Sequence, residues 1–154
     1  MTAMHIGLVY DLRDDYLAEG YSTLDVAEFD APETIAELEA ALRCLGHRVT
    51  RVGHGRSLAA RLVTGERFDL VFSIAEGLKG RSREAQVPAM CELFAQPYGF
   101  SDPLTMAATL DKAVAKRIVR DQGIATADFA LISAPQEARD VDLPFPLFVK
   151  PVAE

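Results

Sequence analysis

The sequence predicts an α/β protein in which a parallel sheet carries helices on both faces. Three short apolar segments, His5–Tyr10, His47–Val52 and Phe68–Ile74, have the length and composition of buried strands. Segments with helical spacing of apolar residues separate them. Strands that alternate with helices in this way pair in parallel through right-handed crossovers, and this alternation defines the expected fold class.

Composition limits the possible functions. The chain has 154 residues, 49% hydrophobic and 25% charged, which fits one globular domain or one domain and part of another. Its net charge of −7 argues against a nucleic-acid-binding surface. Cys44, Cys91 and the three histidines show no metal-ligand spacing. The first strand leaves no room for a signal peptide, and no apolar run reaches membrane-spanning length, so a cytoplasmic protein without a membrane partner is expected.

The first strand is followed by an acidic, aromatic stretch, Asp11–Asp30, which has no clear period and is expected to form a long loop with one helical turn. Ala31-Pro32-Glu33-Thr34 then has the proline and acid that favour a helix start. Apolar residues follow at helical spacing, and Gly46 is the expected stop. They are Ile35, Leu38, Leu42 and Leu45.

After the second strand, Ser57 is expected to cap a short helix that runs to Val63 and ends before Gly65. After the third strand, a charged loop with two glycines leads to a helix over Glu84–Phe94, with Val87, Met90 and Phe94 facing inward. The turn Gln96–Gly99 is expected to lead into an edge strand.

Two further helices are predicted around Leu104–Leu110 and over Asp111–Gln122, the second closed by Gly123. The sequence then changes in character. Phe129–Ile132 and Leu147–Lys150 are short apolar segments expected to form strands, and Ala134–Asp142 is a polar connection between them.

Candidate functional residues follow the carboxyl ends of the strands, where open α/β sheets bind ligands. Glu76 comes directly after the third strand and before a glycine, a placement that suits the ammonium group of an amino acid. Lys79, Arg81 and Arg83 in the same loop are suited to a carboxylate or phosphate. Charged side chains on a solvated surface loop are the alternative interpretation.

Two groups of basic residues could reach a phosphate ligand. Lys112, Lys116 and Arg120 recur every four residues and share one face of a helix, although such stripes are more often solvated. Lys150 ends an apolar segment and is followed by Pro151, so a stiff backbone would hold its side chain in place.

Four sequence segments together resemble the D-alanine–D-alanine ligases of the ATP-grasp class. The first is Phe68–Phe72 with Glu76-Gly77, Gln86 and Glu92; the second joins Tyr98–Pro103 to Thr109–Lys116; the third is Gly123–Thr126; and the fourth is Phe145–Pro151. Their order and spacing agree over nearly the whole chain, which is more specific than any single segment.

The resemblance implies a three-layer, Rossmann-like pre-ATP-grasp domain over residues 1–122, followed by the start of an ATP-grasp domain at 123–154. In that family ATP phosphorylates the carboxylate of one amino acid, and the amine of a second attacks the acylphosphate. Lys112 and Lys150 match positions that would contact ATP. The phosphate loop and the Mg²⁺ ligands would lie beyond residue 154, so the isolated chain is expected to be inactive.

The chain departs from the family pattern in the amino-acid site. Glu76 stands where the family usually has a histidine, and Arg81-Ser82-Arg83 replaces an acidic, glycine-containing run. Glu28 is the nearest candidate for the substrate-binding glutamate that usually follows the first strand. A peptidoglycan-type D-alanine ligase and a ligase for other amino acids or dipeptides therefore both remain open.

Two other interpretations are possible. One is a non-catalytic domain, derived from such a ligase, that binds a metabolite or a protein partner. The other is an unrelated doubly wound protein, such as a flavodoxin-like regulator. The resemblance also implies a homodimer, because ligases of this family commonly pair through their N-terminal domains.

Overall fold

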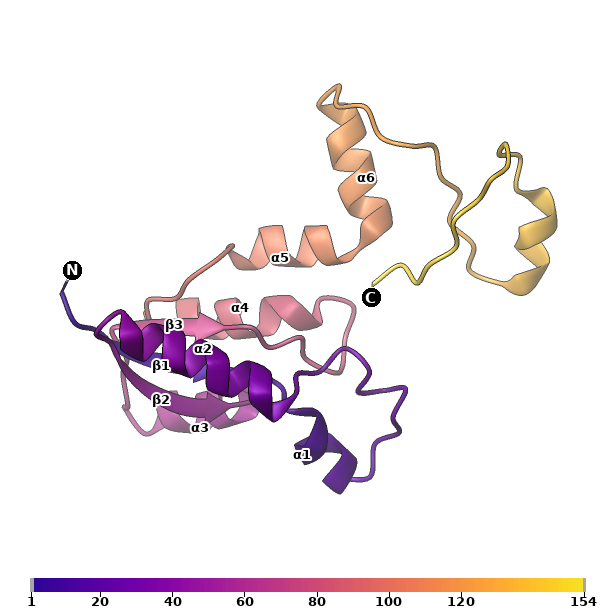
Figure 1. The fold of residues 1–154 in the computed structure, drawn as a ribbon. Helices are drawn as coiled ribbons and strands as arrows, with labels where there is room; N and C mark the ends of the chain where they lie inside the picture. The colour runs from indigo at the N-terminus through magenta and orange to yellow at the C-terminus, as the bar shows by residue number, and fades with distance from the viewer. Residues whose placement is uncertain (1, 154) are drawn as a thin grey trace.

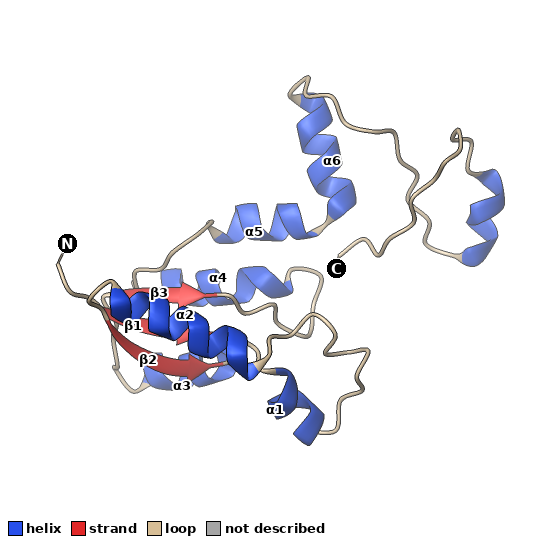
Figure 2. Ribbon diagram, in the orientation of Figure 1, coloured by secondary structure: helices blue, strands red, loops and turns tan. Residues whose placement is uncertain are grey.

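The computed structural model describes residues 2–153 and has the predicted α/β architecture (Figures 1 and 2). Its sheet contains β1 (His5–Val9), β2 (Arg48–Gly53) and β3 (Leu70–Ser73). The strand order is β2-β1-β3, and both pairings are parallel. The predicted fold class is therefore confirmed, and the three carboxyl ends lie along one edge of the sheet.

Helices cover both faces of this sheet. The side chains of Leu8 and Val49 pack with Ile35 of α2 (Pro32–Cys44) on one face. On the other face, Val9 packs among residues of α3 (Gly55–Val63) and α4 (Gln86–Leu93). Because successive residues of a strand point to opposite faces, the apolar run of β1 supplies both cores. Figure 1 shows α2 and α3 on opposite sides of the sheet.

The centre of the sheet requires a glycine. A Cβ added at Gly7 of β1 would lie 2.9 Å from the ring of Phe68. That ring is 4% exposed and packs over the strand at this point. The close approach of the two explains a glycine inside an otherwise apolar strand.

The stretch Asp11–Asp30 is more ordered than predicted. It contains α1 (Arg13–Ala18) and returns to its starting point, where the amide of Asp30 donates to the Asp11 carbonyl at 3.1 Å. Tyr16, Val26 and Phe29 form a small buried core inside it. Aromatic and aliphatic contacts between residues distant in sequence hold this segment, so periodicity alone did not reveal it.

Two predicted boundaries differ from the structure. The helix expected to begin at Ser57 begins at Gly55, and its N-cap is His54, whose Nδ1 accepts from the Ser57 amide at 3.1 Å. The expected edge strand after Gln96 is a single parallel bridge between Tyr98 and Val71. A short 3₁₀ turn, η1 (Arg83–Ala85), precedes α4, whose Cys91 is fully buried.

Both predicted helices after residue 100 are present as α5 (Pro103–Leu110) and α6 (Lys112–Asp121). The side chain of Asp102 accepts from the first-turn amides of α5, and that of Asp111 does the same for α6. Side-chain caps of this kind fix where a helix begins. In Figure 1 α6 leads away from the sheet.

The prediction of two strands after Gly123 is wrong. Neither Phe129–Ile132 nor Leu147–Lys150 forms a strand, and a 3₁₀ helix, η2 (Pro135–Asp140), lies between them. Both segments run outside the sheet without a neighbouring strand to supply hydrogen bonds (Figure 2). Among residues 2–153, none of the helices is both long and apolar enough to cross a membrane.

Candidate functional site

A buried aspartate joins the segments that follow β1 and β3. Asp11, two residues after β1, is 2% exposed. Its Oδ1 accepts from the Tyr16 hydroxyl at 2.6 Å, and its Oδ2 accepts from the Gly77 amide at 2.7 Å. Burial and the nearby Asp11 carboxylate raise the pKa of Tyr16, so its hydroxyl stays protonated and continues to donate. Asp11 thus fixes α1 and the loop after β3 relative to β1.

The loop after β3 turns back on itself at Gly77. This residue has a φ of +68°, and an added Cβ would lie 3.0 Å from the Arg83 carbonyl oxygen. A side chain would meet both backbone strain and a backbone clash here. Glycine at this position therefore permits the close approach of the loop to Arg83.

Arg83 joins the two acids predicted to bind substrate. Its guanidinium, 10% exposed, forms an ion pair with Glu28 and lies 3.7 Å from a carboxylate oxygen of Glu76. It also donates to the carbonyl of Ala153. Glu28 and Glu76, far apart in sequence, are thus brought together, and the group between them is an arginine of the chain itself.

The carboxyl of Glu76 has a pKa close to neutral pH. Burial is the largest cause that raises its pKa to about 7, followed by the carboxylates of Glu84 and Glu28, and Arg83 opposes the rise. At such a pKa the group exists in both forms around neutrality. The ionised form can accept an ammonium group, and the protonated form can donate a hydrogen bond.

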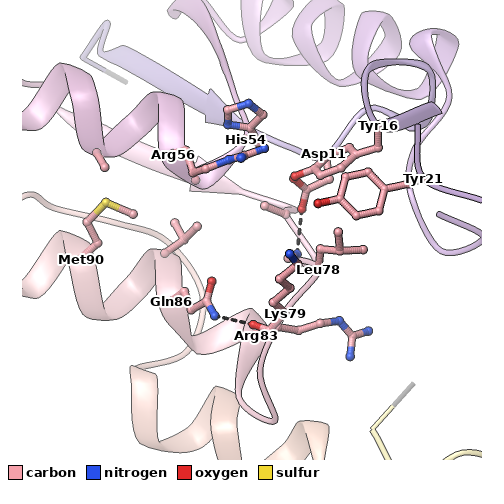
Figure 3. Close-up of a pocket in the computed structure, with 15 residues that line it drawn as sticks. Asp11, Tyr16, Tyr21, His54, Arg56, Leu78, Lys79, Arg83, Gln86 and Met90 are labelled. Atoms are coloured by element: carbon pink, nitrogen blue, oxygen red, sulfur yellow. Dashed lines mark hydrogen bonds between the residues drawn. The ribbon is translucent and has the colours of Figure 1, made fainter. Parts of the chain in front are cut away.

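Two pockets open at this edge. The first, of about 290 Å³, lies between the loops and the starts of α3 and α4, and we call it the cationic pocket (Figure 3). Its polar lining includes Asp11, Tyr16, Tyr21, His54, Arg56, Lys79, Arg83 and Gln86. The second, of about 300 Å³, is the glutamate pocket, lined by Glu76, Glu84, Tyr98, Phe100 and Ser101 among others. Ala75 and Val87 line both, so the two pockets adjoin.

The two lysines predicted to contact ATP lie outside both pockets. Lys112 is the half-buried first residue of α6, and its amide donates to the Val152 carbonyl at 2.9 Å. Lys150 is exposed, with its ammonium 5.9 Å from the centre of the Phe148 ring. Neither ammonium donates to another group within residues 2–153. The backbone contact at Val152 nevertheless returns the C-terminal segment to the start of α6.

The other two residues of the basic stripe on α6, Lys116 and Arg120, contact the segment that follows the helix. Lys116 donates to the Ala127 carbonyl at 2.7 Å, and Arg120 pairs with Asp128 at 3.2 Å. Both cations also lie over the ring of Phe129 at 5.3 Å from its centre. Cation–π and ion-pair contacts of this kind hold the segment that follows the helix.

Asp11 was expected only as one acid of a loop, and Arg83 was expected to bind a carboxylate or phosphate, without any sign that Glu28 and Glu76 would be its partners. A signal existed for Asp11, because an acid directly beyond a buried strand, followed by a tyrosine in the next turn, predicts a shielded carboxylate. Arg83 had no such signal, since its three partners come from three separate segments. Arg81, from the same loop, donates to Asp111 Oδ2 at 3.0 Å and so holds the N-cap of α6.

The described part of the chain contains no cluster of three or more His, Cys, Asp or Glu side chains arranged to hold a metal ion. The two pockets lie at the carboxyl edge of the sheet, where open α/β sheets commonly form their ligand sites. No protein-family model matches the chain.

Comparison with curated proteins shows which class of enzyme this chain resembles in sequence. A D-alanine–D-alanine ligase of Nitratidesulfovibrio vulgaris strain DP4 is 37% identical over 115 residues, which is 74% of this chain and 37% of the relative. The D-alanine–D-alanine ligase of Anaeromyxobacter dehalogenans is 36% identical over 127 residues, 79% of this chain and 40% of the relative. A Sinorhizobium fredii protein named "uncharacterized protein y4sG" is 38% identical over 122 residues, 73% of this chain and 35% of the relative.

The chain is therefore related in sequence to D-alanine–D-alanine ligases over about three quarters of its length. It spans only about two fifths or less of the length of these relatives. The relationship supports the predicted resemblance at the level of the ligase family.

Proposed function

We propose that this chain is the N-terminal part of an ATP-dependent carboxylate–amine ligase that acts through an acylphosphate. The observation that carries the proposal is the meeting of Glu28 and Glu76 at the carboxyl edge of the sheet, in a chain related to D-alanine–D-alanine ligases. In this proposal residues 1–122 form the pre-ATP-grasp domain and 123–154 begin the ATP-grasp domain. The protein would be cytoplasmic and form a homodimer.

Glu28 and Glu76 would hold the ammonium group of an amino-acid or dipeptide substrate. Arg83 pairs with Glu28 and lies 3.7 Å from Glu76, so the incoming ammonium would compete with its guanidinium. Because the pKa of Glu76 is about 7, this carboxylate gains its full charge only above neutral pH. Amine binding should therefore strengthen as pH rises through 7.

Lys112 and Lys150 fit a phosphate-binding role. Both side chains end in an ammonium that donates to no acceptor within residues 2–153, and the Lys112–Val152 contact brings their two segments together. When bound, ATP would supply the phosphoryl group that activates the substrate carboxylate. The two lysines would stabilise negative charge on the phosphates. Mg²⁺ would be held by residues beyond this chain.

The test is release of phosphate from ATP by the protein of the complete reading frame, assayed with a panel of D- and L-amino acids. Stimulation by D-alanine would identify a peptidoglycan-type dipeptide ligase, and stimulation by other amino acids alone would keep the mechanism and change the substrate. Lys112→Ala and Lys150→Ala should each lower the stimulated rate by at least about tenfold, whereas Arg117→Ala on the same helix should not. A folded protein that releases no phosphate with any amino acid would contradict the proposal.

The second candidate is a non-catalytic domain that binds a metabolite or a protein partner. The observation that favours it is the ion pair between Arg83 and Glu28, which already occupies the acids that a substrate amine would use. Metabolite binding without any ATP-dependent phosphate release from the complete protein would support this candidate.

A further inference from the structure

Basic side chains outnumber acids in the lining of the cationic pocket, and the proposed ammonium site does not use Arg56 or Lys79. Three basic side chains line it, those of Arg56, Lys79 and Arg83. Asp11 is the one acid in its lining, and both of its oxygens already accept hydrogen bonds, from Tyr16 and Gly77. The acids that pair with Arg56 and Arg83, which are Glu19, Glu28 and Glu76, do not themselves line the pocket.

Two of these cations are available to a ligand. Lys79 forms no ion pair and its ammonium donates no hydrogen bond within residues 2–153. Arg56 pairs with Glu19 at 3.2 Å, but its side chain is 68% exposed. Exposed pairs of this kind contribute little, so the guanidinium can exchange Glu19 for a ligand at small cost.

His54 adds a hydrogen-bond donor. Its Nδ1 accepts from the backbone amide of Ser57 at 3.1 Å, so a ring proton lies on Nε2. The ring also lines the cationic pocket. Donors therefore dominate the polar lining, which suits a ligand group with several acceptor oxygens.

The remaining walls are apolar. The apolar side chains of the lining are those of Ala59, Ala75, Leu78, Val87 and Met90. An inorganic anion would leave this surface without contacts, whereas the methylene groups of a small organic acid would cover it. The volume of about 290 Å³ suits a ligand of amino-acid size.

The position of the pocket identifies which carboxylate it would hold. Lys112 and Lys150, the proposed ATP contacts, line neither pocket. A carboxylate must lie beside the ATP phosphates to be activated, so a carboxylate held in the cationic pocket is a second one. The adjoining glutamate pocket contains Glu76 and Glu84, which suit an ammonium group instead.

We propose that the cationic pocket binds the second carboxylate of a dicarboxylate substrate of the acidic amino-acid class, held by Arg56, Lys79 and His54. This assignment rests on the proposed ligase function and specifies its substrate class. It places the side-chain carboxylate of the substrate near α3 and its ammonium near Glu76.

The test is calorimetric titration of the 154-residue chain, without ATP, with both enantiomers of aspartate and glutamate, with asparagine and glutamine, and with inorganic phosphate. At least one acidic amino acid should bind saturably and about tenfold or more tighter than its amide counterpart. Equal binding of acid and amide, tighter binding of phosphate, or no saturable binding would overturn the proposal.

Variants locate the ligand. Arg56→Gln and Lys79→Gln should each weaken binding of the acidic amino acid by about tenfold, because each removes one charge-assisted contact. Both residues are exposed, so their thermal unfolding should match that of the unsubstituted chain. Arg48→Gln, an exposed arginine at the opposite end of β2, is the matched control and should leave binding unchanged. Equal affinity in all three variants would contradict the assignment.

The binding result is independent of the proposed catalytic function. If an acidic amino acid binds but the complete protein releases no phosphate from ATP, the ligand class of the pocket stands, whereas the ligase function and the ligand's role as its substrate fail. If phosphate release is stimulated by neutral amino acids alone, the ligase function stands and the assignment of this pocket fails.

Discussion

The sheet region and the segment after residue 123 contain similar apolar sequences with opposite outcomes. Leu8 and Val9 of β1 are each 0% exposed, whereas Phe148 and Val149 are 86% and 88% exposed. Both pairs belong to short apolar runs that predict strands. The difference is the neighbourhood, since β1 pairs with β2 and β3 while the Phe148 segment has no strand beside it.

A strand is stabilised by the hydrogen bonds and side chains of its neighbours more than by its own propensity. Apolar sequence therefore predicts that a segment is suited to burial but does not supply the partner. In this chain the partner exists for residues 5–9 and is absent from the described residues for 147–150.

The largest expected change in stability comes from truncating a buried side chain of the sheet region, compared with an exposed one after residue 123. Leu8→Ala should lower the free energy of unfolding by about 3 kcal/mol, because it leaves a cavity between β1 and α2. Phe148→Ala should change it by less than about 0.5 kcal/mol, because an exposed ring contributes little. Urea denaturation of both variants provides the measurement. A large loss in Phe148→Ala would show that the C-terminal segment packs in solution.

A smaller effect is expected where the two regions touch. Arg83→Gln should destabilise the chain by about 2 kcal/mol at pH 8, because Glu28 and Glu76 lose their shared cation. Hydrogen exchange should also speed up around Ala153, whose carbonyl accepts from Arg83. Arg48→Gln serves as the control and should alter neither quantity. Unchanged exchange near Ala153 in Arg83→Gln would mean that this contact does not hold the segment.

The next effect on stability concerns the hydrogen bond between the Tyr16 hydroxyl and the buried Asp11 carboxylate. Tyr16→Phe should cost about 1–2 kcal/mol, because Asp11 loses a donor while it stays buried. Tyr21→Phe, in the same pocket, should cost less than about 0.5 kcal/mol, since no hydrogen bond of its hydroxyl is formed within residues 2–153. Thermal unfolding compares the pair. Equal losses would show that Asp11 does not depend on Tyr16.

The smallest effect concerns the pH dependence of stability. The folded chain holds the Glu76 proton up to a pKa of about 7, above the unfolded value of 4.5, so it binds more protons than the unfolded chain between these values. This contribution is present below about pH 4.5 and is lost as pH rises through 7. After discounting for solvent screening, the loss is on the order of 1 kcal/mol.

Glu76→Gln should remove that part of the slope between pH 5 and 8. Urea denaturation at several pH values in this range would measure it, with Glu33→Gln on the exposed start of α2 as the control. If Glu76→Gln and the unsubstituted chain lose stability in parallel, Glu76 does not carry a raised pKa.

Much of the fold could be predicted from the sequence, because most helices and strands bury a face whose apolar residues recur at regular spacing. The three strands and the helices over α2 to α6 followed from apolar spacing, prolines and glycines, within a few residues at their ends. The start of α3 was misplaced because Ser57 is a common cap and histidine a rare one, yet His54 supplies the accepting nitrogen.

The candidate site was predicted less completely. Glu28 and Glu76 were identified separately, and their proximity emerged only from the folding of the Asp11–Asp30 segment over the sheet edge. Arg83 could not be assigned, because its role depends on Glu28, Glu76 and Ala153 meeting in space. The roles of Glu28, Glu76, Lys112 and Lys150 toward substrate and ATP stay predictions.

The central claim, that the protein activates a carboxylate with ATP, is tested most directly by trapping with hydroxylamine. The protein of the complete reading frame would be incubated with ATP, Mg²⁺, hydroxylamine and single amino acids, and the hydroxamate product would be measured. A carboxylate–amine ligase should form hydroxamate from its amino-acid substrate only when ATP is present, and more slowly in Lys150→Ala. A folded protein that forms no hydroxamate with any amino acid tested would contradict the account.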